Sequence, residues 1–406
     1  MHFTLRESAI QQPKSPPTPA SWSGICGISS LRFCFRELAK CSVGQHTSSR
    51  PLADRTLALY IESKVSPRQH YADVALLLAN SRIVNYGAGI NMRVVSLLAS
   101  ATEIVCALGA GEMLVGRSHE CDNPDWVRRL PPCSSPAFDV SVSSREIDTE
   151  VRRRLRSGKP LYHVDGELIR ELRPDLLITQ AHCEVCAVTP GDVERSGACA
   201  LTARQIALSA SSLDEIFQSV RHISQALSLE PQGDALVRRE QERIAAVRQR
   251  VKAFRRPSVV MLEWTDPLFA MGNWGPELVE IANGELLLGK KGEYSAAIPA
   301  EQLRDADPEY LIVAPCGFNL ERSLRELTVL EQHPWWQELQ AVRKGNVAFA
   351  DGNLFFNRSG MTISETAEII AEILHGVSFG RTAGVRWRWI EAQAASDVPR
   401  TMVSRT

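Results

Sequence analysis

The sequence predicts an α/β protein with two Rossmann-like lobes joined by a long helical segment. From Met92 onward, short apolar runs alternate with amphipathic stretches, which is typical of α/β domains. Residues 213–256 carry apolar side chains at helical spacing with little interruption. The order helix, acid–proline turn, strand occurs twice, in Glu-Leu-Arg-Pro-Asp-Leu-Leu-Ile at 171–178 and in Asp-Ala-Asp-Pro-Glu-Tyr-Leu-Ile at 305–312. A repeated unit on either side of a helix predicts two lobes with a cleft between them.

These patterns divide the chain into five segments. Residues 92–212 are the predicted N-terminal α/β lobe, 213–256 the connecting helical segment and 257–376 the C-terminal α/β lobe. Residues 1–91 have a Pro/Ser-rich patch and weak periodicity, so we expect a poorly ordered N-terminal extension. Residues 377–406 are unpatterned and are expected to form a disordered tail.

Periodicity then places the elements of each lobe. In the first lobe we expect strands at 93–98, 113–116, 176–179 and 205–208, and helices at 101–108 and 166–172. Ser100, followed three residues later by Glu103, predicts an N-cap and a capping box for the first of these helices. In the second lobe we expect strands at 258–262, 310–314 and 347–350, and helices at 275–283, 299–306, 335–342 and 362–374.

Thiols and imidazoles gather in the loops that follow the predicted strands of the first lobe. In open α/β sheets, such loops at the carboxyl ends of the strands are where ligands bind. His119 and Cys121 follow one strand, and Cys183 and Cys186 follow another. Two such pairs could supply the soft ligands of a tetrahedral metal site. The alternatives are that these residues order their loops, or that Cys183 is a redox thiol at a helix start.

Aromatic side chains gather in the corresponding loops of the second lobe. Flat aromatic walls suit a large, flat, partly apolar ligand, although ordinary core packing is the alternative for any one of these residues. The candidate ligand-binding residues are Ser100, His119, Cys121, Gln180, Cys183, Cys186, Trp264, Trp274, Cys316, Phe318, Asn353 and Phe356. The candidate metal ligands among them are His119, Cys121, Cys183 and Cys186.

The composition argues against several classes of function. With 46 basic and 47 acidic residues and a net charge of -1, there is no general reason to expect nucleic acid as a partner. No apolar run is long enough to predict a transmembrane segment. Neither a Gly-x-Ser-x-Gly turn nor a phosphate-binding glycine-rich loop is present, so we predict no catalytic residues. Residues 1–25 lack the apolar core of a signal peptide, which favours a cytoplasmic location.

Four sequence runs carry a family resemblance. They are Arg-Val-Val-Ser-Leu-Leu-Ala-Ser-Ala-Thr-Glu-Ile at 93–104, Leu-Arg-Pro-Asp-Leu-Leu-Ile at 172–178, Trp274 with Pro-Glu-Leu-Val at 276–279, and Asp-Gly-Asn at 351–353 with Phe356 and Arg358. Together they resemble the periplasmic-binding family for cobalamin and iron siderophores, over residues 92–376. The resemblance implies the helical-backbone metal-receptor fold, also called the class III periplasmic-binding fold. It also implies a non-enzymatic protein that binds a corrinoid, such as cobalamin, or an iron or other metal chelate between its lobes.

The resemblance implies partners as well. In exported members an acidic residue on each lobe docks onto an ABC permease, and Glu194 and Glu277 are the candidates here. A periplasmic location would follow from the family, against the cytoplasmic one favoured by residues 1–25. The Cys-Glu-Val-Cys run at 183–186 looks like that of a cysteine-bearing subgroup usually labelled cobalamin-binding. The alternative is an intracellular metal- or thiol-dependent enzyme, or a metal-binding protein, that uses the four candidate metal ligands.

Overall fold

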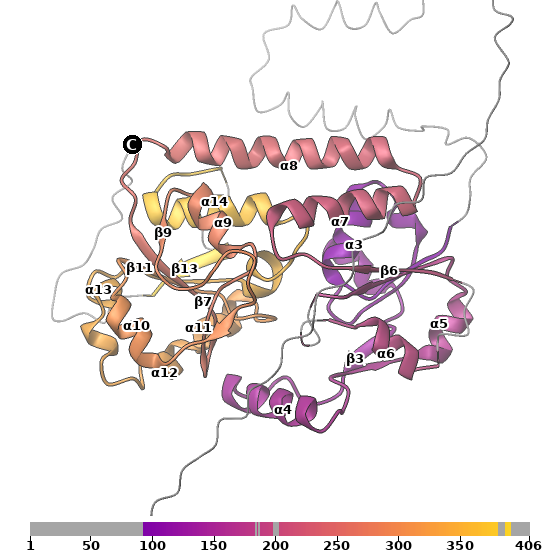
Figure 1. The fold of residues 1–406 in the computed structure, drawn as a ribbon, viewed down its shortest axis with the longest axis horizontal. Coiled ribbons are helices and arrows are strands. Elements are labelled where there is room, and N and C mark those ends of the chain that lie inside the picture. Colours follow the sequence, from indigo (N-terminus) through magenta and orange to yellow (C-terminus); the bar gives the residue numbers. More distant parts are fainter. Residues whose placement is uncertain (1–91, 183–184, 186, 198–202, 381–385, 391–406) are drawn as a thin grey trace, which may run out of the picture. The chain divides into compact units, whose positions relative to one another are not determined.

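The computed structural model describes residues 92–182, 185, 187–197, 203–380 and 386–390. All of these residues belong to one compact unit, which begins at residue 87. The predicted N-terminal extension therefore lies outside the described residues. Within this unit the chain forms two α/β lobes, each built on its own sheet (Figure 1).

The N-terminal lobe contains a four-stranded parallel sheet. Its strands are β1 (Val94–Ser96), β2 (Leu114–Arg117), β5 (Leu176–Gln180) and β6 (Arg204–Leu208), in the order β2-β1-β5-β6. The helices of this lobe are α3 (Ala99–Ala107), α4 (Ser144–Arg156), α5 (Gly166–Leu172) and α6 (Pro190–Arg195). A small antiparallel pair, β3 (Ser134–Pro136) with β4 (Tyr162–Val164), flanks α4, and two short 3-10 turns, η1 (Gly111–Met113) and η2 (Asp125–Arg129), flank β2.

The C-terminal lobe contains a seven-stranded mixed sheet in the order β10-β8-β7-β11-β12-β13, with β9 paired to β7. Its strands are β7 (Ser258–Thr265), β8 (Leu268–Ala270), β9 (Glu285–Leu286), β10 (Ala296–Ala297), β11 (Tyr310–Val313), β12 (Val347–Ala350) and β13 (Trp387–Trp389). Its helices are α9 (Gly275–Ile281), α10 (Ala300–Ala306), α11 (Leu320–Arg325), α12 (Leu327–Leu330), η4 (Trp336–Glu338), α13 (Gln340–Arg343), the π-turn η5 (Gly352–Phe356) and α14 (Ile363–His375). Strand β13 lies in the segment predicted to be a disordered tail, so that prediction is wrong for residues 387–389, which pair with β12.

The connecting segment consists of two helices instead of one continuous rod. Helix α7 (Leu213–Ala226) ends before Ser228, whose φ of 57° lets the chain turn back into α8 (Glu230–Val251). Helix α7 packs on α3 of the first lobe, and α8 packs on α7 and on α14 of the second lobe. The 22 residues of α8 span ~33 Å, which is enough to bridge both lobes (Figure 1). The rigid connection is therefore α8, with α7 supporting it from the first lobe.

Helix α3 does not begin as predicted. Its N-cap is Leu98, which makes no side-chain cap, and Ser100 lies inside the first turn. Glu103 is only 3% exposed and forms an ion pair with Arg358 instead of a capping box. The structure places a capping box at α4, where Ser143 and Glu146 bond reciprocally. The predicted helix at 335–342 is also interrupted, because it consists of η4 and α13.

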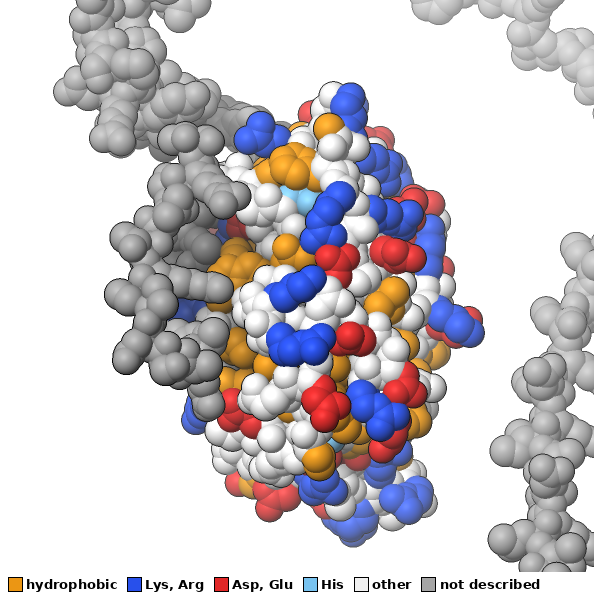
Figure 2. Space-filling model, turned by 90° about the vertical axis from the view of Figure 1, so that its left-hand side faces the viewer, with side chains coloured by type: hydrophobic (Ala, Val, Ile, Leu, Met, Phe, Trp, Pro, Cys, Tyr) orange, Lys and Arg blue, Asp and Glu red, His pale blue; other side chains and the backbone are white. Residues whose placement is uncertain are grey.

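Charged side chains are interspersed on the face of the molecule shown in Figure 2, where basic and acidic groups alternate over short distances. This arrangement fits the nearly balanced composition. Among the described helices, none is long and apolar enough to cross a membrane.

Candidate functional site in the interlobe cleft

The two lobes enclose a cavity of about 340 Å³, whose walls come from both sheets. The loops after β1, β2 and β5 line it from the first lobe, and the end of β7 and the loops after β8, β11 and β12 line it from the second. Eight of the predicted ligand-binding residues are in its wall: Ser100, His119, Gln180, Trp264, Trp274, Cys316, Phe318 and Asn353. Parallel strands bring their carboxyl ends to one edge of each sheet, so residues far apart in sequence meet here.

Two of the predicted residues are not in the wall. The thiol of Cys121 is 1% exposed and lies 3.0 Å from Thr102 Oγ1 and 3.3 Å from Ser118 Oγ, inside the first lobe. Burial raises the pKa of this thiol, which disfavours a thiolate. Phe356 is fully buried and belongs to the core. Cys183 and Cys186 lie outside the described residues.

The predicted chelating pair of His119 and Cys121 is therefore wrong, because the imidazole faces the cavity while the thiol points into the lobe. Over the part of the chain that the structure describes, no three His, Cys, Asp or Glu side chains are grouped to hold a metal ion. The alternative of a metal- or thiol-dependent enzyme relies on His119, Cys121, Cys183 and Cys186. Of these four, His119 and Cys121 are described, and Cys121 is not accessible to a ligand in the cavity.

His119 is held in one orientation by its neighbours. Its Nδ1 lies 2.9 Å from Ser134 Oγ, its Nε2 lies 3.5 Å from Glu120 Oε1, and its ring is tilted against Tyr162. Burial lowers the pKa of His119 to about 4. The imidazole is therefore neutral at pH 7, and a neutral imidazole with one nitrogen fixed by a hydrogen bond can bind a metal through the other.

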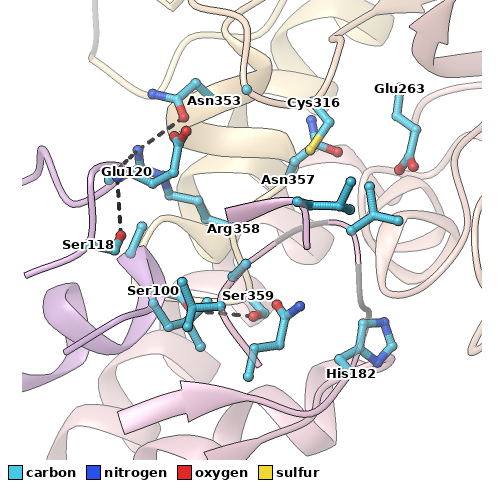
Figure 3. A pocket seen from close by; sticks show the side chains of 18 of the residues that line it. Ser100, Ser118, Glu120, His182, Glu263, Cys316, Asn353, Asn357, Arg358 and Ser359 are labelled. Atoms are coloured by element: carbon cyan, nitrogen blue, oxygen red, sulfur yellow. Dashed lines mark hydrogen bonds between the residues drawn. The ribbon is translucent and has the colours of Figure 1, made fainter. Parts of the chain in front are cut away.

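The lobes are joined at the inner end of the cavity by a buried ion-pair cluster, which we call the Arg358 cluster. The Arg358 guanidinium lies 2.8 Å from Glu103 Oε1 and 2.6 Å from Asp122 Oδ1, both in the first lobe. Asn353 accepts from Arg358 and donates to Asp122 at 3.1 Å. Figure 3 shows Arg358 and Asn353 beside Glu120 at one side of the pocket.

Sequence reasoning did not identify Arg358 and Glu103 as functional residues. In the sequence, Arg358 belongs only to the family motif, and Glu103 fits the position of a capping residue. The two residues are 255 positions apart, so their contact leaves no local pattern in the sequence. The one feature that could have marked the site is an arginine in a loop that follows a strand. Burial raises the pKa of Glu103, and the arginine offsets only part of that rise.

A second set of contacts, which we call the α4 bridge, joins the lobes below the cavity. Glu326 accepts hydrogen bonds from Ser144 at the start of α4 and from Thr265 at the end of β7. Trp264 donates through Nε1 to the carbonyl of Ser144 at 3.2 Å. Helix α4 thereby holds Ile147 and Val151 against the cavity.

A third contact closes another side of the cleft. His182, from the loop after β5, places Nε2 3.0 Å from Asn273 Oδ1 in the second lobe. Tyr294 donates its hydroxyl to the backbone carbonyl of His182 at 2.6 Å. Figure 3 shows His182 apart from Ser100 and Ser359, with Glu263 and Cys316 across the pocket from them. The lobes are thus in direct contact at each of these three places.

The two predicted docking acids differ in their surroundings. Glu194 is exposed on α6 of the first lobe. The Glu277 side chain is 14% exposed, pairs with Lys291 at 2.9 Å and accepts from the backbone of Leu213, the first residue of α7. Glu277 therefore stabilises the junction of α7 with the second lobe and is a poor candidate for docking.

Comparisons with known proteins agree with this architecture. No curated protein matches the sequence. Among solved structures, a periplasmic heme-binding protein from Pseudomonas aeruginosa has a TM-score of 0.53 and 20% identity, covering 73% of this chain and 96% of that one. The heme-binding protein RhuT from Roseiflexus sp. RS-1 has a TM-score of 0.52 and 22% identity, covering 70% and 97%. The vitamin B12 binding protein BtuF of Vibrio cholerae has a TM-score of 0.50 and 18% identity, covering 69% and 95%.

These similarities confirm the predicted class III periplasmic-binding fold. The sequence model of the family described as "Periplasmic binding protein" matches residues 94–354, which is more than half of the chain and includes both lobes and α8. The chain therefore belongs to the periplasmic binding protein family.

Proposed function

We propose that the interlobe cleft binds a flat, metal-centred chelate, either a corrinoid or an iron porphyrin, as cargo and not as a substrate for turnover. The structural neighbours include proteins named for binding heme and vitamin B12. The observation that carries the proposal is the cavity wall itself. Aromatic side chains from the second lobe and a neutral imidazole from the first line the same cavity.

The aromatic wall suits one face of a planar macrocycle. Trp264 and Phe318 pack with ring centroids 5.1 Å apart, and Trp274 and Phe269 extend the same wall. Offset aromatic contact of this kind contributes ~1 kcal/mol for each pair beyond the burial of apolar area. A macrocycle that enters between the lobes is therefore held mainly by apolar and aromatic contact.

The metal of such a cargo has two candidate ligands from the protein. His119 offers Nε2 with Nδ1 fixed by Ser134, and Cys316 presents a partly exposed thiol to the same cavity. We assign His119 as the axial ligand, because its ring is fixed by the first lobe and its low pKa keeps it neutral.

A titration of the purified chain with dicyanocobinamide and with iron protoporphyrin, followed by visible absorbance and gel filtration, tests this function. We expect co-elution of at least one macrocycle and a shifted absorbance band. His119→Ala removes the shift and weakens binding about tenfold or more, whereas His222→Ala, at an exposed position on α7, leaves both unchanged. Absence of co-elution and of any spectral change with both macrocycles contradicts the proposal.

The proposed partner is an ABC permease, and Glu194 is the proposed docking residue of the first lobe. The exposed carboxylate on α6 can pair with an arginine of a permease without disturbing the lobe. The family name supports a periplasmic site of action for this chain. Fractionation of cells that express a tagged full-length chain tests the compartment, and recovery only in the cytoplasmic fraction contradicts it.

A further inference from the structure

Helix α4 stands apart from the lobe to which it belongs in sequence. Residues 137–161, which we call the α4 excursion, leave the first lobe after β3 and return to it at β4. These two strands form a sheet of their own, and a hydrogen bond of 2.9 Å from the backbone of Ala137 to that of Leu161 closes the base of the excursion. Figure 1 shows α4 on the opposite side of the molecule from α8. The excursion is thus attached to the first lobe through a narrow neck, β3 and β4.

The apolar side of α4 faces the cavity. Ile147, Val151 and Leu155 follow one another at intervals of four residues and so lie on one face of the helix. Ile147 and Val151 are in the cavity wall, whereas most other side chains of α4 are charged. Although Ile147 is buried, it lies outside the three hydrophobic clusters that the described residues form. The helix therefore offers its apolar face to a molecule that fills the cavity.

The segment that leads into α4 is fastened to the second lobe by Arg322. The guanidinium of Arg322 donates at 2.7 Å to each of the backbone carbonyls of Val140 and Val142. It also lies 3.8 Å from the centre of the Phe318 ring, which fixes its position in the second lobe. One arginine of the second lobe thus holds two backbone groups of the excursion.

The first turn of α4 is fastened in the same way. Ser144 donates to Glu326 at 2.8 Å in the α4 bridge, and Arg145, whose side chain is 75% exposed, pairs with Asp266 at 2.7 Å. Of the described helices and strands, β7 of the second lobe is the element on which α4 packs most extensively. These fastenings are hydrogen bonds and ion pairs, which water replaces when the two parts separate.

The contact between the lobes on the α8 side is of a different kind. One hydrophobic cluster there combines side chains from α3, α7, α8, α9 and α14. Its members include Ile104, Val220, Ile244, Leu278 and Ile370, each at most 8% exposed. Separation of the lobes at this side would expose a continuous apolar core to water, at a cost that grows with the exposed area. Release of the α4 excursion leaves this core intact.

We propose that the α4 excursion is a lid on the cleft. Cargo enters and leaves when the excursion detaches from the second lobe and bends at its neck, while α8 and the Arg358 cluster keep the lobes in place. Bound cargo packs against Ile147 and Val151 and therefore favours the closed lid. This inference rests on the proposed function for the identity of the cargo, whereas the motion is a property of the chain without cargo.

A reversible disulfide across the α4 bridge tests the lid. The hydroxyl oxygens of Ser144 and Thr265 lie 3.3 Å apart, so the double variant Ser144→Cys, Thr265→Cys places two thiols within reach of each other. Peptide mapping confirms the bond, and stopped-flow absorbance follows the association of dicyanocobinamide and iron protoporphyrin. We expect association to be at least tenfold slower in the oxidised variant than in the same variant after reduction and removal of the reductant.

The wild-type chain, taken through the same oxidation and reduction, is the control for its native thiols. Its association rate should change less than twofold between the two treatments. Equal association rates in the oxidised and reduced forms of the double variant overturn the proposal.

Spin-label distances distinguish a moving lid from separating lobes. Labels attached by a chemistry that does not use cysteine replace Arg153 on α4, Glu167 on α5 and Glu301 on α10, which are all exposed. In the reduced double variant without cargo, the Arg153–Glu301 pair should show a longer population that the oxidised form lacks. The Glu167–Glu301 pair should keep one distance in both forms. A longer population in both pairs, or in neither, overturns the proposal.

The lid and the proposed function fail in different ways. If a macrocycle binds equally fast to the oxidised and reduced forms, the lid is overturned while the proposed function stands. If neither macrocycle binds, the proposed function falls, and the label distances in the chain without cargo still decide whether α4 moves as a lid.

Discussion

Replacement of Arg358 by methionine tests how strongly the buried cluster holds the lobes together. The substitution keeps most of the apolar stem but removes the charge. Glu103 then stays 3% exposed with only Asn123 bonded to Oε1, while its Oε2 has no hydrogen-bond partner in the native protein. Removal of one partner from a buried ion pair costs about 3–5 kcal/mol, because the other charge is left uncompensated. We expect Arg358→Met to lower the free energy of unfolding by about that amount at pH 7.

The pH dependence of this loss follows from Glu103. Burial already raises its pKa above the ordinary 4.5, and the loss of Arg358 removes the main influence that lowers it. A carboxyl whose folded pKa is raised stabilises the fold fully below its unfolded pKa, and that contribution is lost as the pH rises through the folded value. Each pH unit within that window costs about 1.4 kcal/mol. The variant should therefore be closest to the wild type near pH 4.5 and furthest from it at pH 7.

Urea unfolding followed by circular dichroism at pH 4.5 and pH 7 measures both effects. The matched control is the double variant Arg358→Met, Glu103→Gln, in which no buried charge is left and about 2 kcal/mol or more should be regained at pH 7. A loss of less than 1 kcal/mol at pH 7 would refute the reasoning that Arg358 compensates a buried charge. An equal loss at both pH values would show that Glu103 is not the uncompensated group.

Three further predictions concern other parts of the cleft. Ser144→Ala removes one hydrogen-bond donor to Glu326 in the α4 bridge. Because one hydrogen bond contributes ~1 kcal/mol, the variant should release the ligand about fivefold faster in stopped-flow measurements. An unchanged release rate would show that α4 does not retain the ligand. Gly352→Ala places a Cβ 2.1 Å from the carbonyl oxygen of Pro315 and should destabilise the fold by about 1–3 kcal/mol in thermal denaturation. Gly191→Ala is the control and should be tolerated, because its Cβ approaches the flexible end of the Arg195 side chain at 3.3 Å and otherwise makes an ordinary contact with Thr189 Oγ1 at 3.7 Å. Burial lowers the pKa of His119 from 6.5 to about 4 in the folded protein. The stability that the neutral imidazole contributes is therefore present above pH 6.5 and is lost, by up to about 3 kcal/mol, as the pH falls toward 4. His119→Gln should flatten the dependence of the unfolding free energy on pH over this range, and an unaltered dependence would contradict the low pKa.

Local sequence was sufficient to place most strands and helices. The predicted ranges agree closely with β5, β11 and β12 and with α5 and α10. The reason is that the alternation of buried and exposed side chains along a strand or helix is set by residues close together in sequence. The same reasoning missed β13 and the short strands β8–β10, whose lengths of two or three residues are too small for a periodic signal. It also merged α7 and α8, since a single residue with positive φ leaves no periodic trace.

The sequence alone determined that two α/β units flank a helical segment, and that the residues after their strands would meet at a cleft. This follows from strand polarity, which is a property of the chain itself. Only the tertiary structure decided which way each side chain in those loops faces: His119 toward the cavity, Cys121 into the lobe, and Arg358 toward two acids of the other lobe. The orientations of His119 and Cys121 depend on packing against other segments of the first lobe, and that of Arg358 on charge compensation by acids more than 200 positions away. No local pattern encodes such contacts.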